Sequence, residues 1–354
     1  MPSSSQLGVI VCGAGVFGRN HLRVYRMLER EGAAVRLAAI VEPAPSRAQA
    51  AAAEWSVPVF ASLEEALAAR HRGDFALAAA SVCTPTSAHF QTAHLLLEDG
   101  IDVLVEKPIA TTVAEADKLV GLANANRRIL QTGHLERFNP AVAATVPLLN
   151  HPMFFEAHRL SVFSPRSLDV DVVLDLMIHD LDIVLSLVGS PVRSLHAVGL
   201  PILSGKVDIA NVRIEFDSGC VANFTASRVS TERVRKLRFF QPHQYVSIDY
   251  ARQDLLLIDV SRAAEAGPEM LAAASAAAQA HPLGGFPGLH IEKPTVEPGE
   301  PLRLEIESFL ECVRTRSKPR VSGVDGRAAL ALALDINTAI AEHAKRAGLD
   351  QVSS

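Results

Sequence analysis

Short runs of apolar residues alternate with amphipathic stretches through the first third of the chain. The amphipathic stretches, such as 18–30 and 88–98, have the spacing of helices that bury one face. Apolar runs without strict alternation are typical of strands that are covered on both faces of a sheet. This pattern predicts an α/β Rossmann domain, a doubly wound parallel sheet. The runs are Leu7–Cys12, Val35–Val41, Phe75–Val82, Ile101–Val105 and Ile129–Thr132.

After about residue 140 the pattern changes to strand-like segments in close succession. Along one of them, Val212, Ile214 and Phe216 alternate with charged residues, so one face of the strand is apolar and the other polar. The turn Asp217-Ser218-Gly219 is typical of a hairpin. With a helix predicted over Val172–Val188, the pattern indicates an α+β C-terminal domain with an open, largely antiparallel sheet. The segments are Phe154–Val162, Leu195–Leu200, Val207–Phe216, Cys220–Val229, Val234–Phe240, Tyr245–Tyr250 and Leu255–Val260.

The two patterns divide the chain into a domain of residues 1–138 and a domain of residues 139–354. Within the second, residues 262–299 contain alanine runs followed by a Gly/Pro-rich stretch, and we expect an inserted helix and loop there. Helical patterns over 305–316 and 326–346 close the chain.

Composition narrows the classes of function. Of the 354 residues, 49% are hydrophobic and 21% are charged, and the formal net charge is −5. This balance gives no electrostatic footprint for nucleic acid or an anionic membrane surface, so we expect neither as a partner. The first residues lack the pattern of a signal peptide, and no apolar run approaches the roughly 18 residues of a membrane-spanning helix. We therefore expect a cytoplasmic protein.

The cysteines are scattered and form no C-x-x-C pair, which would be the signal for a zinc site or a redox pair. We expect all four to be reduced and structural, and we expect no metal. They are Cys12, Cys83, Cys220 and Cys312.

The segment Gly13-Ala14-Gly15-Val16-Phe17-Gly18 lies between the first predicted strand and the first predicted helix. A dinucleotide site needs a tight turn at the first glycine, close approach of the backbone to the pyrophosphate at the second, and close helix-strand packing at the third. N–H groups at the start of the helix then face the phosphates. Glycine turns are common, so the prediction gains its weight from Glu42, which ends the next apolar run near the expected spacing of about 20 residues.

Glu42 also bears on the choice of dinucleotide. A carboxylate accepts hydrogen bonds from the ribose hydroxyls of adenosine but repels a 2′-phosphate, so NAD is favoured over NADP as the cofactor. Arg47 is the competing observation, because its guanidinium is able to pair with such a phosphate. The other interpretation of Arg47 is a solvated helix residue.

The next strand ends at Thr84 and Pro85, and His89 lies on the helix that follows. Small and hydroxyl residues at this edge of the sheet allow the backbone to approach the nicotinamide half of the cofactor. We expect these three residues to contact the cofactor. The alternative is a simple strand-to-helix turn that is capped by Thr86 or Ser87.

Glu106-Lys107-Pro108 follows the fourth apolar run. Open α/β sheets bind their ligands at the carboxyl ends of the strands, so Lys107 is a candidate for catalysis, and Glu106 and Lys107 for contact with the cofactor. The same triplet recurs at Glu292-Lys293-Pro294 after a Gly/Pro-rich stretch, and we interpret that copy as a coincidence. The position of the triplet carries the prediction.

Asp175 and His179 are four residues apart in a predicted helix, so they share one face. The same spacing suits two ligands of a metal, but no third ligand is obvious nearby. Taken alone, the pair is better interpreted as a polar helix face with a satisfied histidine.

Together and in this order, the motifs resemble the Gfo/Idh/MocA oxidoreductase family. The resemblance also includes the closing segment 319–326. It implies an NAD(P)-dependent dehydrogenase in which an NAD-binding Rossmann domain precedes a domain for substrate binding and oligomerisation, with Lys107, Asp175 and His179 as the catalytic residues. It further implies a homodimer or homotetramer assembled through the C-terminal sheet. Many members have a glycine-rich approach to the helix, whereas residues 171–174 here read Asp-Val-Val-Leu, which leaves the geometry of the substrate loop open.

Segments 133–140, 175–182 and 226–230 resemble more narrowly the branch that oxidises C3 of nucleotide-linked sugars, such as the UDP-N-acetylglucosamine 3-dehydrogenases that act before an aminotransferase in lipid A sugar synthesis. A nucleotide-sugar substrate carries a diphosphate, and guanidinium groups bind phosphates in bidentate fashion. We expect two of five arginines to serve: Arg159, Arg166, Arg228, Arg233 and Arg235. The predicted substrate-binding residues are Lys107, His134, Arg137, Asn139, Arg159, Arg166, Asp175, His179 and Arg228.

Oxidation of a secondary alcohol removes the hydroxyl proton while a hydride leaves the same carbon. Histidine has an ordinary pKa near 6.5 and accepts a proton at neutral pH, so His179 is a natural general base. Lys107 would hydrogen-bond the hydroxyl oxygen, and Asp175 would orient the imidazole or the sugar. Lys107 serves as the base instead if burial lowers its pKa. Two alternative functions remain: oxidation or reduction of another polyol, free sugar or small carbonyl, and a non-enzymatic regulator that senses the dinucleotide.

Overall fold

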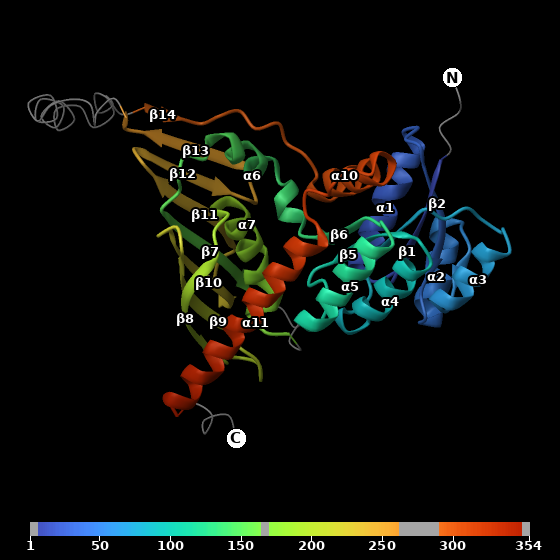
Figure 1. Ribbon diagram of the computed structural model, residues 1–354, viewed down its shortest axis with the longest axis horizontal. Helices are drawn as coiled ribbons and strands as arrows, with labels where there is room; N and C mark the ends of the chain where they lie inside the picture. Colours follow the sequence, from blue (N-terminus) through green and yellow to red (C-terminus); the bar gives the residue numbers. More distant parts are fainter. Residues whose placement is uncertain (1–5, 164–169, 262–289, 349–354) are drawn as a thin grey trace, which may run out of the picture. The chain divides into compact units, whose positions relative to one another are not determined.

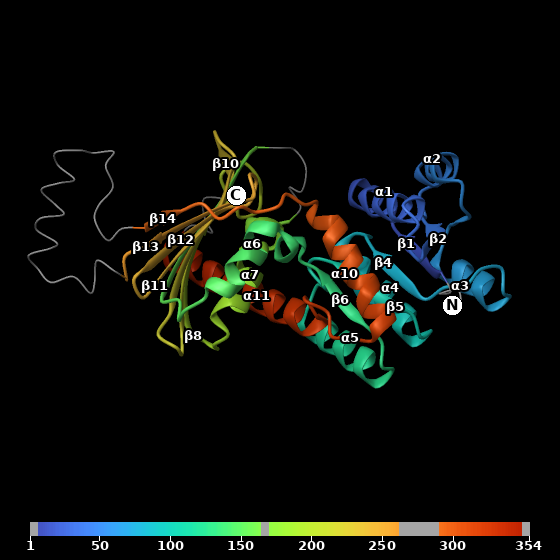
Figure 2. The same ribbon diagram turned by 90° about the horizontal axis from the view of Figure 1, so that it is seen from above.

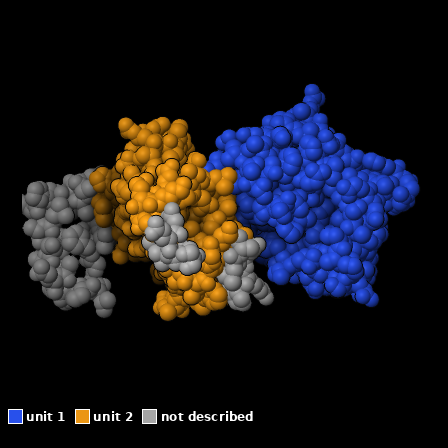
Figure 3. Space-filling view, turned by 90° about the horizontal axis from the view of Figure 1, so that it is seen from below, with its two compact units in different colours: residues 1–138, 299–331 blue, residues 139–298, 332–354 orange. Residues whose placement is uncertain are grey.

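The structure is a computed structural model that describes residues 6–163, 170–261 and 290–348. The chain divides into two compact units, residues 1–138 with 299–331 and residues 139–298 with 332–354 (Figure 3). The sequence pattern divides the chain after residue 138 and assigns all of 139–354 to the second domain. In the structure, residues 299–331 complete the first unit instead.

A six-stranded parallel sheet forms the centre of the first unit, with the strand order β3-β2-β1-β4-β5-β6 (Figure 1). Every residue of β4, β5 and β6 is buried, as the continuous apolar runs predict. The sequence pattern misses β3, because two residues are too few to show a period. The strands are β1 (Leu7–Cys12), β2 (Val35–Val41), β3 (Val59–Phe60), β4 (Ala79–Val82), β5 (Asp102–Glu106) and β6 (Leu130–Gly133).

Helices cover both faces of this sheet (Figures 1 and 2). Helix α1 (Val16–Arg30) packs beside α10 (Pro301–Thr315), and Leu22 and Tyr25 of α1 share one core with Ile306 and Phe309 of α10. This apolar surface is the reason that residues 299–331 return to the first unit. Helices α4 and α5 pack together on the other face. The remaining bounds are α2 (Pro45–Trp55), α3 (Leu63–His71), α4 (Thr86–Glu98), α5 (Val113–Ala125) and the 3₁₀ turn η1 (Leu135–Phe138).

An eight-stranded sheet forms the second unit, with the order β14-β13-β12-β11-β7-β10-β9-β8. Strands β7 and β10 are parallel, and the other neighbours are antiparallel, which confirms the predicted sheet type. The strands are β7 (Phe154–Val162), β8 (Val192–Leu200), β9 (Ile209–Phe216), β10 (Val221–Ser230), β11 (Val234–Gln241), β12 (Gln244–Asp249), β13 (Asp254–Asp259) and β14 (His290–Glu292). Of the predicted insertion, residues 262–289 lie outside the described residues.

Short helices lie over one face of this second sheet (Figure 1). They are α6 (Pro140–Thr145), the 3₁₀ turn η2 (Val146–Leu148), the π-helical segment η3 (Val173–Met177) and α7 (Ile178–Val188). Helix α11 (Gly323–Arg346) begins in the first unit and continues in the second. The alternation in β9 is confirmed, since Val212, Ile214 and Phe216 are buried. The predicted hairpin joins β9 to β10 at Gly219, whose φ is +84°.

The four cysteines are free thiols, and Cys12, Cys220 and Cys312 are buried. Burial raises the pKa of Cys12 to about 12 and that of Cys220 to about 11, so neither thiol forms a thiolate readily. In the described part of the chain, no helix is both long and apolar enough to cross a membrane.

Candidate active site

The glycine turn connects β1 to α1 and is built for close packing. Gly13 has a φ of +95°, and a Cβ on Gly18 would lie 1.8 Å from the carbonyl oxygen of Gly13. A Cβ on Gly15 would meet no atom of the protein within 4 Å. The open space therefore lies at the start of α1, where Val16 and Phe17 are exposed. The backbone N–H groups at the start of a helix are suited to bind an anion. The turn fits the pyrophosphate of a dinucleotide.

Glu42 follows β2 and holds the turn from the side. Its Oε2 accepts a hydrogen bond from the N–H of Ala14 (2.9 Å), and its Oε1 accepts from the N–H of Ala44 (2.9 Å) and from Arg47 (2.9 Å). Burial acts to raise the pKa of Glu42, but these donors outweigh it and the pKa is lowered. A carboxylate has about four acceptor positions, and three of them are filled here by donors of the protein itself. Glu42 is 2% exposed.

A cavity of about 390 Å³ adjoins the turn within the first unit. Gly15 and Val16 line it from the turn, and Arg47 and Trp55 line it from α2. Arg47 pairs with Glu42, and its side chain is 57% exposed. This position suits both a solvated helix residue and a cation that contacts a phosphate. The cavity thus lies between the start of α1 and the helix α2.

His89 is buried beneath the site. Its Nδ1 lies 2.8 Å from the carbonyl oxygen of Pro108, and its Nε2 lies 2.9 Å from that of Thr84. Burial is the main cause that lowers the pKa of His89. The imidazole thus links the residue that follows β4 to the turn that follows β5, and Pro85 begins α4 between them as its N-cap. Both ring nitrogens of His89 thus contact backbone carbonyl oxygens. Its contact with the cofactor stays a prediction.

Glu106 ends β5 and its carboxylate is enclosed. Its Oε1 lies 2.9 Å from Nε2 of His21, which is fully buried in α1. A Cβ on Gly133 would lie 2.8 Å from the same oxygen. Glu106 is therefore paired with His21 and closely packed against Gly133, just before Lys107. Its contact with the cofactor stays a prediction.

Lys107 is partly buried, and a histidine lies in its electrostatic field. His134 follows β6 and is 1% exposed. Burial, and next the positive charge of Lys107, lower the pKa of His134 to about 3. His134 is thus neutral at physiological pH. Arg137, one turn later in η1, donates to the carbonyl oxygen of Arg320 (3.2 Å).

Asp175 and His179 lie in the second unit at the junction of η3 and α7, and both are partly buried. The sequence predicts one continuous helix here, but the structure has a π-helical turn over Val173–Met177 before the α-helix. π-helical turns are rare and occur frequently at functional sites. The two side chains are therefore presented by a special backbone geometry that periodicity could not reveal.

Arg159 was predicted to contact a phosphate, but it lies in the core of the second unit. Its Nε and its terminal nitrogen donate to the two carboxylate oxygens of Asp180 at 2.8 and 2.9 Å, and its guanidinium lies 5.2 Å from the centre of the Tyr250 ring. Both partners of the pair are almost fully buried. A bidentate buried pair holds β7 against α7, so this guanidinium serves the fold.

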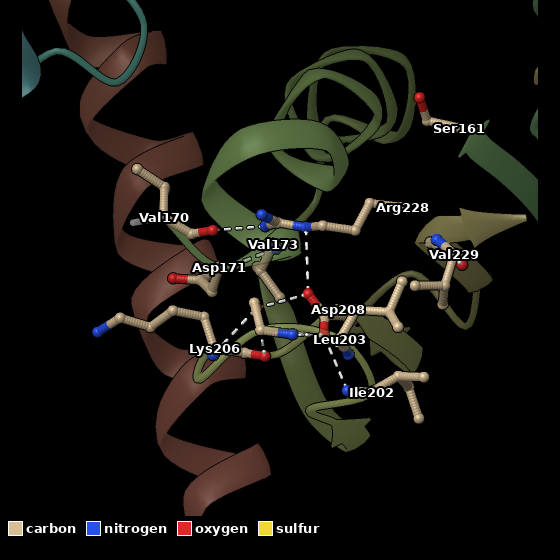
Figure 4. A network of polar contacts seen from close by, with 12 residues as sticks. Ser161, Val170, Asp171, Val173, Ile202, Leu203, Lys206, Asp208, Arg228 and Val229 are labelled. Atoms are coloured by element: carbon tan, nitrogen blue, oxygen red, sulfur yellow. Dashed lines mark hydrogen bonds and ion pairs between the residues drawn. The ribbon is translucent and has the colours of Figure 1, made fainter. Parts of the chain in front are cut away.

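Arg228 is likewise directed inward. It is 5% exposed, donates to the carbonyl oxygen of Val170, and has its Nε 3.6 Å from Oδ1 of Asp208 (Figure 4). These contacts lie within the chain, and the contact of Arg228 with substrate stays a prediction.

The other predicted substrate residues differ in position. Asn139 is buried, caps α6 by accepting from the N–H of Ala141 (3.1 Å), and donates to the carbonyl oxygen of Tyr250 (3.0 Å). Arg166 lies outside the described residues. Arg233 and Arg235, at the start of β11, are exposed, so they are the cations of the predicted set that remain open to a phosphate.

Sequence reasoning missed three residues that shape these sites: His21, Gly133 and Asp208. His21 lies within an ordinary amphipathic pattern, and Asp208 is the second residue of the predicted strand 207–216. Gly133 alone had a signal, because it directly follows an apolar run and begins the segment 133–140. Within 6–163, 170–261 and 290–348, no cluster of three or more His, Cys, Asp or Glu is suited to hold a metal ion.

Comparisons with known proteins agree with this geometry. Residues 7–134 match the family described as "Oxidoreductase family, NAD-binding Rossmann fold", and residues 152–241 match the "GFO/IDH/MocA C-terminal domain". UDP-N-acetylglucosamine 3-dehydrogenase of Acidithiobacillus ferrooxidans is 34% identical over 93% of this chain and 96% of its own.

Solved structures give the same result for the fold. A structure of the Acidithiobacillus ferrooxidans enzyme has a TM-score of 0.82 at 33% identity, covering 95% of this chain and 97% of that one. An aldose-aldose oxidoreductase from Caulobacter crescentus, complexed with glycerol, has a TM-score of 0.76 at 21% identity, covering 96% and 98%. The second similarity bears on the fold alone.

Proposed function

Because the chain belongs to the GFO/IDH/MocA oxidoreductase family, we propose that it oxidises the C3 hydroxyl of UDP-N-acetylglucosamine to the 3-keto sugar, with NAD as the cofactor. The observation that carries the substrate is the similarity to the Acidithiobacillus ferrooxidans enzyme, which spans both units instead of the Rossmann domain alone. A ketone at C3 is the group that an aminotransferase converts to an amine. We therefore place the reaction before such a step in lipid A sugar synthesis.

The first unit supplies the cofactor site in this proposal. The glycine turn and the start of α1 hold the pyrophosphate, Glu42 accepts from the adenosine ribose, and the chain at Thr84 and Pro85 borders the nicotinamide. When bound, NAD supplies the acceptor for the hydride that leaves C3. The support for this arrangement is the free space at Gly15 and the family match over residues 7–134.

Three side chains act on the sugar. Lys107 donates a hydrogen bond to the C3 oxygen and stabilises the negative charge that develops as its proton leaves. His179 accepts that proton, and Asp175 orients the imidazole or the sugar. The exposed arginines Arg233 and Arg235 are the candidate partners of the diphosphate.

The direct test is NADH formation from NAD and UDP-N-acetylglucosamine, with a carbonyl-trapping reagent to remove the ketone. Substrate deuterated at C3 should transfer its deuterium to the nicotinamide, which mass spectrometry detects. Turnover of a free polyol such as inositol, without turnover of the nucleotide sugar, would exclude the proposed substrate but keep the dehydrogenase. NAD binding without turnover of any alcohol would favour the sensing regulator.

The role of Lys107 has a matched control in the second Glu-Lys-Pro triplet. We predict that Lys107→Met lowers kcat by about 10²–10⁴-fold, because a positioned proton donor contributes on that order. Lys293→Met changes the exposed lysine of the other triplet and should leave kcat unchanged. Undiminished turnover in Lys107→Met, with NAD still bound, contradicts the mechanism.

We also propose that the protein assembles as a homodimer or homotetramer through the sheet of the second unit. The support is the face of β9 that exposes Asn211, Arg213 and Glu215, beside a family resemblance that implies this mode of assembly. Light scattering after size-exclusion chromatography measures the mass, and a mass of one chain at micromolar concentration would contradict it.

A further inference from the structure

Asp208, just before β9, is a buried acceptor of several hydrogen bonds (Figure 4). It is 0% exposed, and its Oδ2 accepts from the N–H groups of Ile202 (2.8 Å), Leu203 (2.6 Å) and Ser204 (2.8 Å). Its Oδ1 accepts from the hydroxyl of Ser204 (2.6 Å). Burial acts to raise the pKa of Asp208, but the donors of Ser204, Leu203 and Ile202 lower it to about 2. The carboxylate therefore stays charged across the range in which enzymes work.

Arg228 connects this carboxylate to the chain ahead of the catalytic helix. One side of its guanidinium faces Oδ1 of Asp208, with Nε at 3.6 Å, and the other side donates to the carbonyl oxygen of Val170. The backbones are joined as well, because the N–H of Arg228 donates to the carbonyl oxygen of Asp208 (2.9 Å). A charged, buried guanidinium between these two acceptors holds them at a fixed separation.

The segment 170–174 has further anchors beside Arg228. The N–H of Val172 donates to the carbonyl oxygen of Val207 (3.0 Å), next to Asp208. Oδ1 of Asp171 accepts from the N–H groups of Val173 (2.9 Å) and Leu174 (3.0 Å), and its Oδ2 accepts from Asn337 of α11 (3.1 Å). The segment contains no glycine and is fixed at each of its first three residues.

We infer that Asp208 and Arg228 are positioning residues for the reaction: they fix segment 170–174 and thereby aim Asp175 and His179. The segment leads directly into the π-helical turn that carries Asp175, and His179 follows two residues after that turn. Since a misplacement of about 1 Å can cost on the order of 10²-fold in rate, a rigid entry to this turn matters for catalysis. The inference rests on the proposed roles of Asp175 and His179.

Four variants of the full chain test this inference. Arg228→Met and Asp208→Asn break the connection, while Arg252→Met and Asp217→Asn make the same changes at exposed positions in two turns of the second unit. For the first pair we expect kcat to fall or the KM for the sugar to rise by about 10–100-fold. The Kd of NAD should stay within about twofold of wild type, because the glycine turn belongs to the other unit. The control pair should match wild type.

Two readouts separate positioning from plain stabilisation. Arg228→Lys keeps a cation beside Asp208 but is too compact at its head to bridge both acceptors, so it should keep the Tm near wild type and still lower kcat about tenfold. Hydrogen exchange of the peptide covering 170–178 should speed up in Arg228→Met and not in Arg252→Met. If Asp208→Asn does not fold, Ser204→Ala removes a single donor to Oδ1 and should show the same changes in weaker form.

Unchanged kcat and sugar KM in a folded Arg228→Met enzyme overturn the inference, and so does unchanged exchange of 170–178. If wild type oxidises a polyol but not the nucleotide sugar, the proposed substrate fails, and the same variants are measured with that polyol. If no alcohol turns over, there is no reaction to position, and both proposals fail.

Discussion

At the scale of single residues, three buried histidines of the first unit have different surroundings. His21 faces the carboxylate of Glu106, His89 lies between two carbonyl oxygens, and His134 lies in the field of Lys107. Because a buried imidazole is costly to protonate and a nearby cation adds to that cost, burial and the charge of Lys107 lower the pKa of His134 to about 3. The dependence of stability on pH therefore tests whether His134 is held neutral in the folded protein.

We predict that His134 makes the protein less stable in mild acid. Unfolded, the histidine titrates near pH 6.5. In the folded state its pKa is about 3. The contribution of the neutral histidine to stability is therefore complete above pH 6.5 and is lost as the pH falls from 6.5 towards 3. Each pH unit removes about 1.4 kcal/mol of unfolding free energy. His134→Gln should show a shallower fall of Tm between pH 6.5 and 4.5 than wild type.

The control for this prediction is His71→Gln, which changes a largely exposed histidine of α3. Its Tm should follow the wild-type pH dependence, because exposed charges contribute little. A slope that is equal in wild type and His134→Gln would show that His134 is not held neutral.

At the scale of elements, the turn between β1 and α1 contains two glycines, Gly15 and Gly18, with different roles. Gly18 permits contact between the helix and the turn, since a Cβ there would lie 1.8 Å from a backbone oxygen. Gly15 leaves space open at the start of the helix. One glycine is needed by the fold and the other by the ligand.

We predict that Gly18→Ala and Gly15→Ala fail in different ways. Gly18→Ala must move backbone, so it should lower the Tm or prevent folding in the absence of NAD. Gly15→Ala should keep the Tm of the NAD-free protein and weaken NAD binding at least tenfold, because the methyl group occupies space that the pyrophosphate needs. Thermal unfolding and titration calorimetry measure the two effects. Wild-type NAD affinity in Gly15→Ala would contradict the cofactor site.

At the scale of the whole molecule, the first unit is assembled from segments that are far apart in the sequence. Arg316, which ends α10, pairs with both carboxylate oxygens of Asp102 at the start of β5 (2.5 and 3.0 Å) and donates to the carbonyl oxygen of Arg127 (2.9 Å). Asp102 is 2% exposed and also accepts from the N–H of Ile129 (2.8 Å). This ion pair joins the returning segment 299–331 to strand β5 of the sheet.

We predict that Arg316→Ala lowers the unfolding free energy by about 1–3 kcal/mol, since it leaves the buried Asp102 carboxylate without its cation. Arg314→Ala, in the same turn of α10, removes an exposed arginine and should cost well under 1 kcal/mol. Urea unfolding of both variants provides the comparison. Equal stabilities would show that the pair does not hold the segment.

Local features of the sequence were sufficient for the two sheets, for most strands and helices, and for the glycine turn with Glu42 and Lys107 at strand ends. These follow from periodicity and from backbone rules that act over a few residues. The tertiary structure alone decided that residues 299–331 rejoin the first unit, and that Arg159 and Arg228 point inward to Asp180 and Asp208. It also paired His21 with Glu106 and made a π-helical turn at Asp175. The physical reason is that burial and pairing of charge depend on neighbours tens to hundreds of residues away, which no local pattern encodes.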